Sequence, residues 1–362
     1  MGLKFSHVTH ASHVFFGNGS VAQLADAADL LDCQRLLVLS TPGQNRAAQY
    51  LADRFGELCV GVHPEARMHT PVAVTEAALG VVAQREIDCV VSLGGGSAIG
   101  LGKAIAHRTG LPQIAIPTTY AGSEVTPILG QTENGAKTTL RSAGVMPEVV
   151  IYDPELTRSL PVKTSMTSGI NAIAHAVEAL YAENRNPVST LLATEGACTL
   201  IDALPIIAED PLNEAGRERA LYGSWLCGTV LGQVGMALHH KLCHTLGGLF
   251  DLPHAETHTV ILPHATAYNQ RAARAQLAPL GEALDDDDPG AGLFAFARRL
   301  GAPTSLRELG MDENGIDLAV DEALSNPYWN PRKLVRSDIR KLIENAYFGR
   351  EPERQAAASP VR

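Results

Sequence analysis

Short apolar runs alternate with longer stretches of helical periodicity along the first 150 residues. The apolar runs are rich in β-branched residues and bounded by turn formers, which predicts strands at 35–40, 58–62, 87–93, 113–117 and 148–152. Between them, apolar positions recur at helical spacing near 20–31, 44–56, 72–85 and 97–108. This alternation predicts βαβ units and a mostly parallel sheet, and the lack of polar alternation fits a sheet covered on both faces.

The pattern changes after about residue 155, where strand-like runs nearly vanish. Helical stretches follow one another at 165–182, 188–207, 215–235, 238–248, 258–270, 291–300, 316–324 and 336–346. The fold class expected is therefore α/β plus all-α, with a Rossmann-like parallel-sheet domain over 1–155 and a helical domain over 156–362.

Composition and charge exclude several classes of protein. The chain has 362 residues, 45% of them hydrophobic, which excludes a largely disordered chain. It has 29 Lys and Arg against 39 Asp and Glu, a net charge of −10, which argues against a nucleic-acid partner. The six cysteines form no CxxC pair, and we see no signal peptide and no apolar run of 18 residues. We expect a cytoplasmic protein without a membrane partner.

A glycine loop follows the third predicted strand. Gly94, Gly95, Gly96 and Ser97 stand between that strand and a helix, where glycine backbones and a helix N-terminus can receive a phosphate. The fingerprint G-x-G-x-x-G fails, because position 99 is Ile. The loop alone fits equally well a tight strand–helix turn that binds nothing.

Hydroxyl groups follow neighbouring strands and strengthen the case for a cofactor. The candidate cofactor-binding hydroxyls are Ser40, Thr118, Thr119 and Ser123. Ligands of open α/β sheets bind outside the carboxyl ends of the strands, so these residues and the glycine loop predict a dinucleotide site. The strand at 35–40 ends without Asp or Glu for a ribose 2′-hydroxyl and without an adjacent Arg for a 2′-phosphate. We therefore expect NADH use with tolerance of NADPH.

Histidines concentrate in the second half of the chain. Six of the 13 lie within 239–264, and two i, i+4 pairs, His240 with His244 and Asn171 with His175, each share one helix face. With His254, these residues predict either a metal site or a polar catalytic pocket. For His239, His258 and His264 taken singly, helix capping or solvent exposure is the favoured interpretation.

Several linked motifs together resemble the iron-containing (group III) alcohol dehydrogenases. They are SLGGGSAIGLGKAIA at 92–106, PTTYAGSE at 117–124, YDPELTRSLP at 152–161, SGINAIAHAVEA at 168–179 and HTLGG…LPHAETHTVILPHA at 244–265. The resemblance implies an active site in a cleft between the two domains. It also implies that an ion, if present, is held by Asn171, His175, His240 and His254. The family's usual ligand at the first position is Asp, so a divalent metal is doubtful here.

Within that family, the chain is most similar to the branch that reduces maleylacetate. This implies NAD(P)H-dependent reduction of the carbon–carbon double bond of a small dicarboxylate to 3-oxoadipate, in the degradation of aromatic compounds. The implied catalytic residues are His175, His240, His244, His254 and Asn171, with His244 or His254 as general acid. The resemblance also implies a homodimer, in which an early strand at 13–16 could pair at a sheet edge.

Two alternatives remain open at this stage. One is a metal-dependent alcohol dehydrogenase of the same family, which bound metal would distinguish. The other is a non-catalytic nucleotide-binding protein that kept the fold, which failure to oxidise NADH would distinguish.

Overall fold

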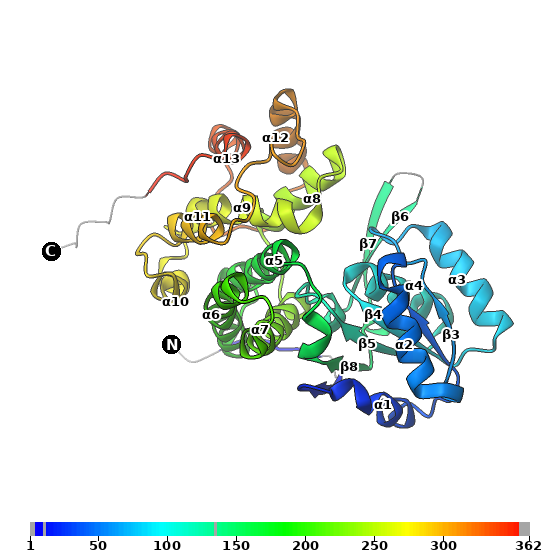
Figure 1. Ribbon diagram of the computed structural model, residues 1–362. Helices are drawn as coiled ribbons and strands as arrows, with labels where there is room; N and C mark the ends of the chain where they lie inside the picture. Colours follow the sequence, from blue (N-terminus) through cyan, green and yellow to red (C-terminus); the bar gives the residue numbers. More distant parts are fainter. Residues whose placement is uncertain (1–3, 10–11, 134–135, 355–362) are drawn as a thin grey trace. The chain divides into compact units, whose positions relative to one another are not determined.

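The computed structural model describes residues 4–9, 12–133 and 136–354, which form two compact units (Figure 1). The unit that we call the α/β unit comprises Val8–Leu160 and Leu212–Leu221, and the remaining described residues form the helical unit. The sequence pattern placed a boundary at 155/156. In the structure the chain changes unit a few residues later, and the segment 212–221 belongs to the α/β unit.

A six-stranded parallel sheet forms the centre of the α/β unit. Its strands, in the order β1-β8-β5-β4-β2-β3, are β1 (His13–Phe16), β8 (Val149–Tyr152), β5 (Gln113–Pro117), β4 (Cys89–Gly94), β2 (Leu36–Leu39) and β3 (Cys59–His63). The five strands predicted from apolar runs are confirmed, and so is the early strand at 13–16. The α/β class of this unit is likewise confirmed.

Helices cover both faces of this sheet, which explains the continuous apolar strands. In β2, Leu36 and Val38 pack in a core with α1 (Leu24–Leu30) and α2 (Asn45–Phe55). Their neighbours Leu37 and Leu39 pack in a second core with α3 (Val72–Gln84) and α4 (Gly96–Thr109). Because successive side chains of a strand point to opposite faces, a strand between two cores is apolar at every position.

A two-stranded hairpin in this unit was not expected. It joins β6 (Ile128–Glu133) to β7 (Ala136–Arg141) in an antiparallel ladder. The sequence carries Asn-Gly at 134–135 between the two strands, and this dipeptide is the strongest short signal for a hairpin. The signal was present and was missed, because neither flanking run is strongly apolar.

The helical unit contains the all-α part of the fold. Its helices are α5 (Val162–Tyr181), α6 (Pro187–Glu209), most of α7 (Glu214–Gln233), α8 (Leu238–Phe250), α9 (His254–Asn269), α10 (Arg274–Leu284), α11 (Pro289–Arg299), α12 (Ile316–Ser325) and α13 (Arg336–Phe348). Helix α9 contacts both α5 and α8, which brings the histidine-bearing segments together (Figure 1).

Two helices differ from the sequence-based prediction. Helix α10 was missed, and it contains Pro279 within an otherwise helical pattern. Helix α9 begins at His254 and not at 258, because Pro253 precedes the first turn and its carbonyl accepts the Thr257 amide at 2.9 Å and the Thr257 hydroxyl at 2.7 Å. As a result His254 and His258 lie four residues apart on one helix, whereas the prediction left His254 outside the helix.

Helix α6 is the one described helix that is long and apolar enough to cross a membrane by length and composition. The sequence pattern predicted no such run. Half of its most apolar 18-residue window is buried inside the protein, and the helix packs against α5 and α10. Its apolar character is therefore accounted for by packing within the helical unit.

Candidate active site

The glycine loop and the hydroxyl-rich loop lie next to each other at the carboxyl edge of the sheet. Strands β4 and β5 pair in register so that Gly94 lies opposite Pro117. The Thr118 amide donates to the Gly94 carbonyl at 3.1 Å, which joins the two loops directly. The Gln44 side chain, from the loop after β2, donates to the Thr118 hydroxyl at 2.7 Å.

Gly94 is favoured by its backbone conformation, and Gly95 by the close approach of a neighbouring side chain. Gly94 has φ +147°, and a Cβ there would lie 2.6 Å from the Gln44 Oε1. A Cβ on Gly95 would lie 2.8 Å from the Thr119 side chain. Nothing lies within 4 Å of the corresponding position on Gly96, the first residue of α4. The N-terminus of α4 is therefore open where a phosphate would be received.

The remaining expected cofactor residues contribute less directly. Ser40 is fully buried, and its hydroxyl donates to the Thr41 carbonyl at 3.3 Å. The Ser123 carbonyl accepts from the buried Lys103 ammonium at 2.6 Å, and Thr126 and Ile128 supply further oxygens to that group. Burial lowers the pKa of Lys103 to about 7. Lys103 thus holds the loop after β5 against α4.

Three of the buried polar side chains of helix α5 belong to the candidate site. They are Asn171, His175 and Glu178, which are 3%, 3% and 0% exposed. Their spacing of four and three residues places them along one helix face. Asn171 Oδ1 and His175 Nδ1 have no hydrogen-bond partner. An unpaired buried polar atom is costly, so its presence here indicates a place where a ligand completes the bonding.

Glu178 organises the start of α8. Its carboxylate accepts the backbone amides of Ala237 and His239, both at 2.7 Å, and His240 Nδ1 lies 2.8 Å from Oε2. A carboxylate only accepts, so His240 carries a proton on Nδ1. In the neutral ring, Nε2 then has a lone pair, and this atom is buried without a partner. Sequence reasoning missed Glu178, because two of its three partners are backbone amides at the start of another helix.

His239 and His258 form a second buried pair. His239 Nε2 lies 3.0 Å from His258 Nδ1, and both side chains are fully buried. The Cys243 sulfur lies 3.7 Å from His239 Nε2. The ligand atoms of His175, His240 and His258 lie within 4.8 Å of one another. The interpretation of His239 and His258 as capping or exposed residues was therefore wrong, because the early start of α9 turns His258 inward.

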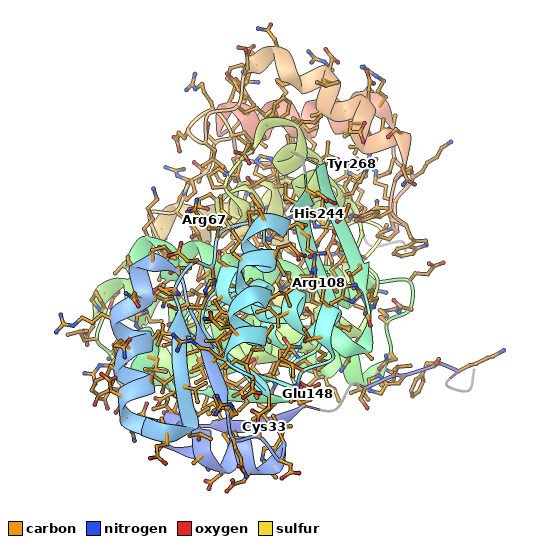
Figure 2. The ribbon with its side chains drawn as sticks, turned by 90° about the vertical axis from the view of Figure 1, so that its right-hand side faces the viewer. Cys33, Arg67, Arg108, Glu148, His244 and Tyr268 are labelled. Carbon is orange, nitrogen blue, oxygen red and sulfur yellow. The ribbon has the colours of Figure 1, made fainter. Side chains whose placement is uncertain are left out.

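His244 and His254 lie at the exposed margin of this cluster. His244 Nδ1 is 3.0 Å from the Tyr328 hydroxyl, and its ring lies 6.0 Å from that of His240. The His254 ring is 4.3 Å from that of His258 at the first turn of α9. Figure 2 labels His244 on α8 and Tyr268 on α9. His264 is buried beside Phe294, so its interpretation as a capping or exposed residue was also wrong.

Burial fixes the charge state of the inner rings. Desolvation, followed by the neighbouring histidines, lowers the pKa of His175, His239 and His258 well below 6.5. These rings are neutral near pH 7. A neutral His175 ring therefore does not attract an anionic ligand by charge.

Two family descriptions cover most of the chain. Residues 11–154 match "Iron-containing alcohol dehydrogenase", and residues 165–347 match "Fe-containing alcohol dehydrogenase family, C-terminal". The chain belongs to the iron-containing alcohol dehydrogenase family. The match confirms the family resemblance that was drawn from the linked motifs.

Among members of this family, relatives named maleylacetate reductase match almost end to end. That of Rhizobium sp. (strain MTP-10005) is 56% identical over 349 residues, covering 96% of this chain and 99% of the relative. The solved maleylacetate reductase of Agrobacterium tumefaciens is 56% identical with a TM-score of 0.94, covering 97% and 100% of the two chains. An iron-containing alcohol dehydrogenase of Corynebacterium glutamicum is 41% identical with a TM-score of 0.91, covering 96% and 98%.

The donor set does not fit the iron that the family's name implies. The polar atoms available are the Asn171 amide oxygen and nitrogens of His175, His240 and His258, none of them anionic. Iron sites of this kind favour at least one carboxylate, whereas a neutral three-histidine set is known for zinc. The histidines whose ligand atoms lie within 4.8 Å of one another include His258, and the expected ligand His254 lies beside it, with the two rings 4.3 Å apart. We therefore derive no step through a metal.

Proposed function

We propose that this chain uses NAD(P)H to reduce the carbon–carbon double bond of maleylacetate to 3-oxoadipate. The observation that carries the proposal is the near full-length identity to proteins named maleylacetate reductase. The neutral polar cluster supports it, because reduction of an enone does not require a Lewis acid to the degree that alcohol oxidation does. The amide at Asn171, where the family's usual carboxylate would be, agrees with this distinction.

The reaction divides into a hydride transfer and a proton transfer. Hydride from the nicotinamide adds to the alkene carbon β to the ketone, and the π electrons move onto the ketone oxygen as an enolate. A proton then adds to the carbon next to the ketone, which restores the carbonyl. The enzyme's tasks are to place the two reactants together, to stabilise the enolate oxygen and to supply one proton.

The two units supply different parts of this chemistry. Gly94, Gly95, Gly96 and Ser97, with Thr118 and Thr119, would hold the cofactor's pyrophosphate at the N-terminus of α4. Asn171 and His175 would contact the substrate through their unpaired atoms. His244 or His254, the two exposed rings, would act as general acid because each can exchange its proton with water. Tyr328 would orient His244 through the bond at 3.0 Å.

The setting of the enzyme is part of the same proposal. We propose a cytoplasmic homodimer that acts on a small dicarboxylate, with no nucleic acid or membrane as partner. Strand β1 is at an edge of the sheet and can extend it by pairing with a second copy. Sedimentation of the purified chain at micromolar concentration would contradict the dimer if it gave the monomer mass.

A substrate panel tests the proposed function. Purified chain is mixed with NADH and either maleylacetate or simple aldehydes, and with NAD⁺ and simple alcohols, while NADH absorbance is followed. We expect rapid oxidation of NADH with maleylacetate and little change otherwise. Reduction of aldehydes without reduction of maleylacetate would favour a metal-dependent alcohol dehydrogenase, and no change with any substrate would favour a non-catalytic nucleotide-binding protein.

A further inference from the structure

A fully buried ammonium group contacts the hydroxyl-rich loop, residues 118–127, in the α/β unit. Lys103, on α4, is 0% exposed. Its Nζ lies 2.6 Å from the Ser123 carbonyl oxygen, 2.7 Å from that of Thr126 and 2.9 Å from that of Ile128, and 3.0 Å from the Thr126 hydroxyl. An ammonium has three N–H donors and no acceptor, so these four uncharged oxygens use every proton. Lys103 therefore acts on a ligand only through the loop.

The hydroxyl-rich loop is fastened at both of its ends. At its start, the Thr118 amide donates to the Gly94 carbonyl at 3.1 Å. Near its end, Lys103 bonds the carbonyls of Ser123 and Thr126. The local turn adds two bonds to the Ser123 carbonyl, from the Thr126 amide at 3.3 Å and the Thr126 hydroxyl at 3.0 Å. The bonds from the ammonium are shorter and charge-assisted, so they are the stronger ones at this end.

Packing of α4 against the hairpin does not need this ammonium. Ala104, the next residue of α4, packs with Leu129 of β6 and with Val145 in an apolar cluster. Burial of the ammonium is costly, and this cost lowers the pKa of Lys103 to about 7, although the charge of Glu124 opposes the shift. An apolar side chain of similar size would not carry that cost. What the ammonium adds is direction, because three backbone carbonyls of one short stretch bond to the same atom.

We infer that Lys103 is a positioning residue for the cofactor, which holds the hydroxyl-rich loop beside the N-terminus of α4 so that both can receive the pyrophosphate. The inference rests on the proposed function, which takes this edge of the sheet as the NAD(P)H site. Lys103 lies seven residues after Gly96, the first residue of α4, and therefore on the same helix face two turns later. The loop and the open N-terminus are thus fixed to one helix. A cofactor that meets a loop already in place does not have to order it on binding, which favours affinity.

Replacement of Lys103 by methionine tests this role. Methionine is unbranched and of similar length, and it removes every donor. NADH is titrated into the purified protein without substrate, and binding is followed by NADH fluorescence. We expect the Kd for NADH to rise ~10–100-fold in Lys103→Met, because binding must then order the loop. The kcat with maleylacetate at saturating NADH should stay within about threefold of wild type, because no group that contacts the substrate is changed.

Arg108→Met is the matched control. Arg108, labelled in Figure 2, is on the same helix and also links α4 to β6, through Gln131 Oε1 at 2.8 Å. It lies 3.2 Å from Glu76 on α3, so its side-chain partners are outside the hydroxyl-rich loop. This variant should bind NADH as wild type does. If the Kd of Lys103→Met lies within about threefold of that of Arg108→Met, the positioning role is wrong.

Hydrogen exchange of the protein without cofactor reports on the loop itself. We expect the amides of 118–128 to exchange about tenfold faster in Lys103→Met than in wild type, and added NADH to slow them. The amides of β2 should be unchanged. Equal loss of protection in β2 would indicate a general loss of stability and would overturn the inference. If Lys103→Met does not fold, Lys103→Gln, which keeps an NH₂ donor, is measured by the same criteria.

Binding and turnover separate this inference from the proposed function. Reduction of maleylacetate by wild type, with equal NADH affinity in wild type and Lys103→Met, would overturn the inference and leave the proposed function in place. Wild type that binds NADH more tightly than Lys103→Met but does not reduce maleylacetate would support the positioning role and contradict the proposed function.

Discussion

Replacement of Glu178 by glutamine tests whether one buried carboxylate organises the histidine cluster. The carboxylate accepts three hydrogen bonds of 2.7–2.8 Å, from two backbone amides and His240 Nδ1. An amide keeps one oxygen and turns its NH₂ toward a donor. The side chain has almost the same shape, so the effect reports charge and hydrogen bonding and not volume.

The magnitude follows from the bonds that change. One charge-assisted bond worth about 1.5–3 kcal/mol is lost, and the two others weaken by about 1 kcal/mol each when the acceptor becomes neutral. Removing a buried charge returns part of this loss. We expect the free energy of unfolding to fall by about 2 kcal/mol. We also expect kcat to fall ~10–100-fold, because the His240 tautomer is no longer fixed.

Glu124→Gln is the matched control for this experiment. Glu124 is also fully buried, but it accepts one bond, from the Tyr152 hydroxyl at 2.7 Å, and its other oxygen has no partner. Burial raises the pKa of Glu124, so its carboxyl is closer to the neutral amide. Urea unfolding followed by tryptophan fluorescence, with steady-state kinetics, measures both variants. If Glu178→Gln costs no more than Glu124→Gln in stability and in kcat, the organising role is refuted.

Three further predictions follow from the site. Activity should survive EDTA, and metal analysis should find well under one ion per chain. The substitution Asn171→Asp should raise the metal content and impair the reduction of maleylacetate. Loss of activity in EDTA that Fe²⁺ or Zn²⁺ restores would contradict this prediction. Cofactor preference between NADH and NADPH should stay below about a thousandfold in kcat/KM, ~4 kcal/mol, because the loop after β2 carries neither an acid nor an adjacent Arg. Burial lowers the pKa of His264 to about 3, so the unfolded chain binds a proton that the folded chain does not between pH 6.5 and 3. Stability is lost as the pH falls through this window. The free energy of unfolding of the wild type, relative to that of His264→Gln, should drop by about 2 kcal/mol between pH 7.5 and 5. A difference between the two proteins that does not vary with pH would contradict the lowered pKa of His264.

The sheet could be predicted from sequence because its strands are apolar at every position. A strand such as β2, with Leu36–Leu39 buried on both faces, gives a strong local signal. The hairpin β6–β7 and helix α10 gave weaker signals, since the hairpin strands are partly polar and α10 contains Pro279. The glycine loop was found because few residues other than glycine fit the positive φ of Gly94 or the space beside Thr119 at Gly95.

The histidine site was predicted only in part, for a structural reason. His175 and His240 were recognised from i, i+4 spacing within single helices. His239 and His258 could not be paired in this way, because they come from different helices and meet only when α8 and α9 pack together. Glu178 was missed because its importance lies in backbone amides of another helix, which no sequence pattern displays.

The position of a transferred deuterium tests the central claim most directly. Maleylacetate is reduced in ordinary water with NADH deuterated at the transferred hydrogen, and the product is examined by NMR. The account predicts 3-oxoadipate with one deuterium on the carbon β to the ketone, where it does not exchange with solvent. The neighbouring carbon, which lies between that carbon and the ketone, receives a hydrogen from the solvent. Deuterium on the carbon that bore the ketone oxygen, which is the outcome of an alcohol dehydrogenase, would contradict the account.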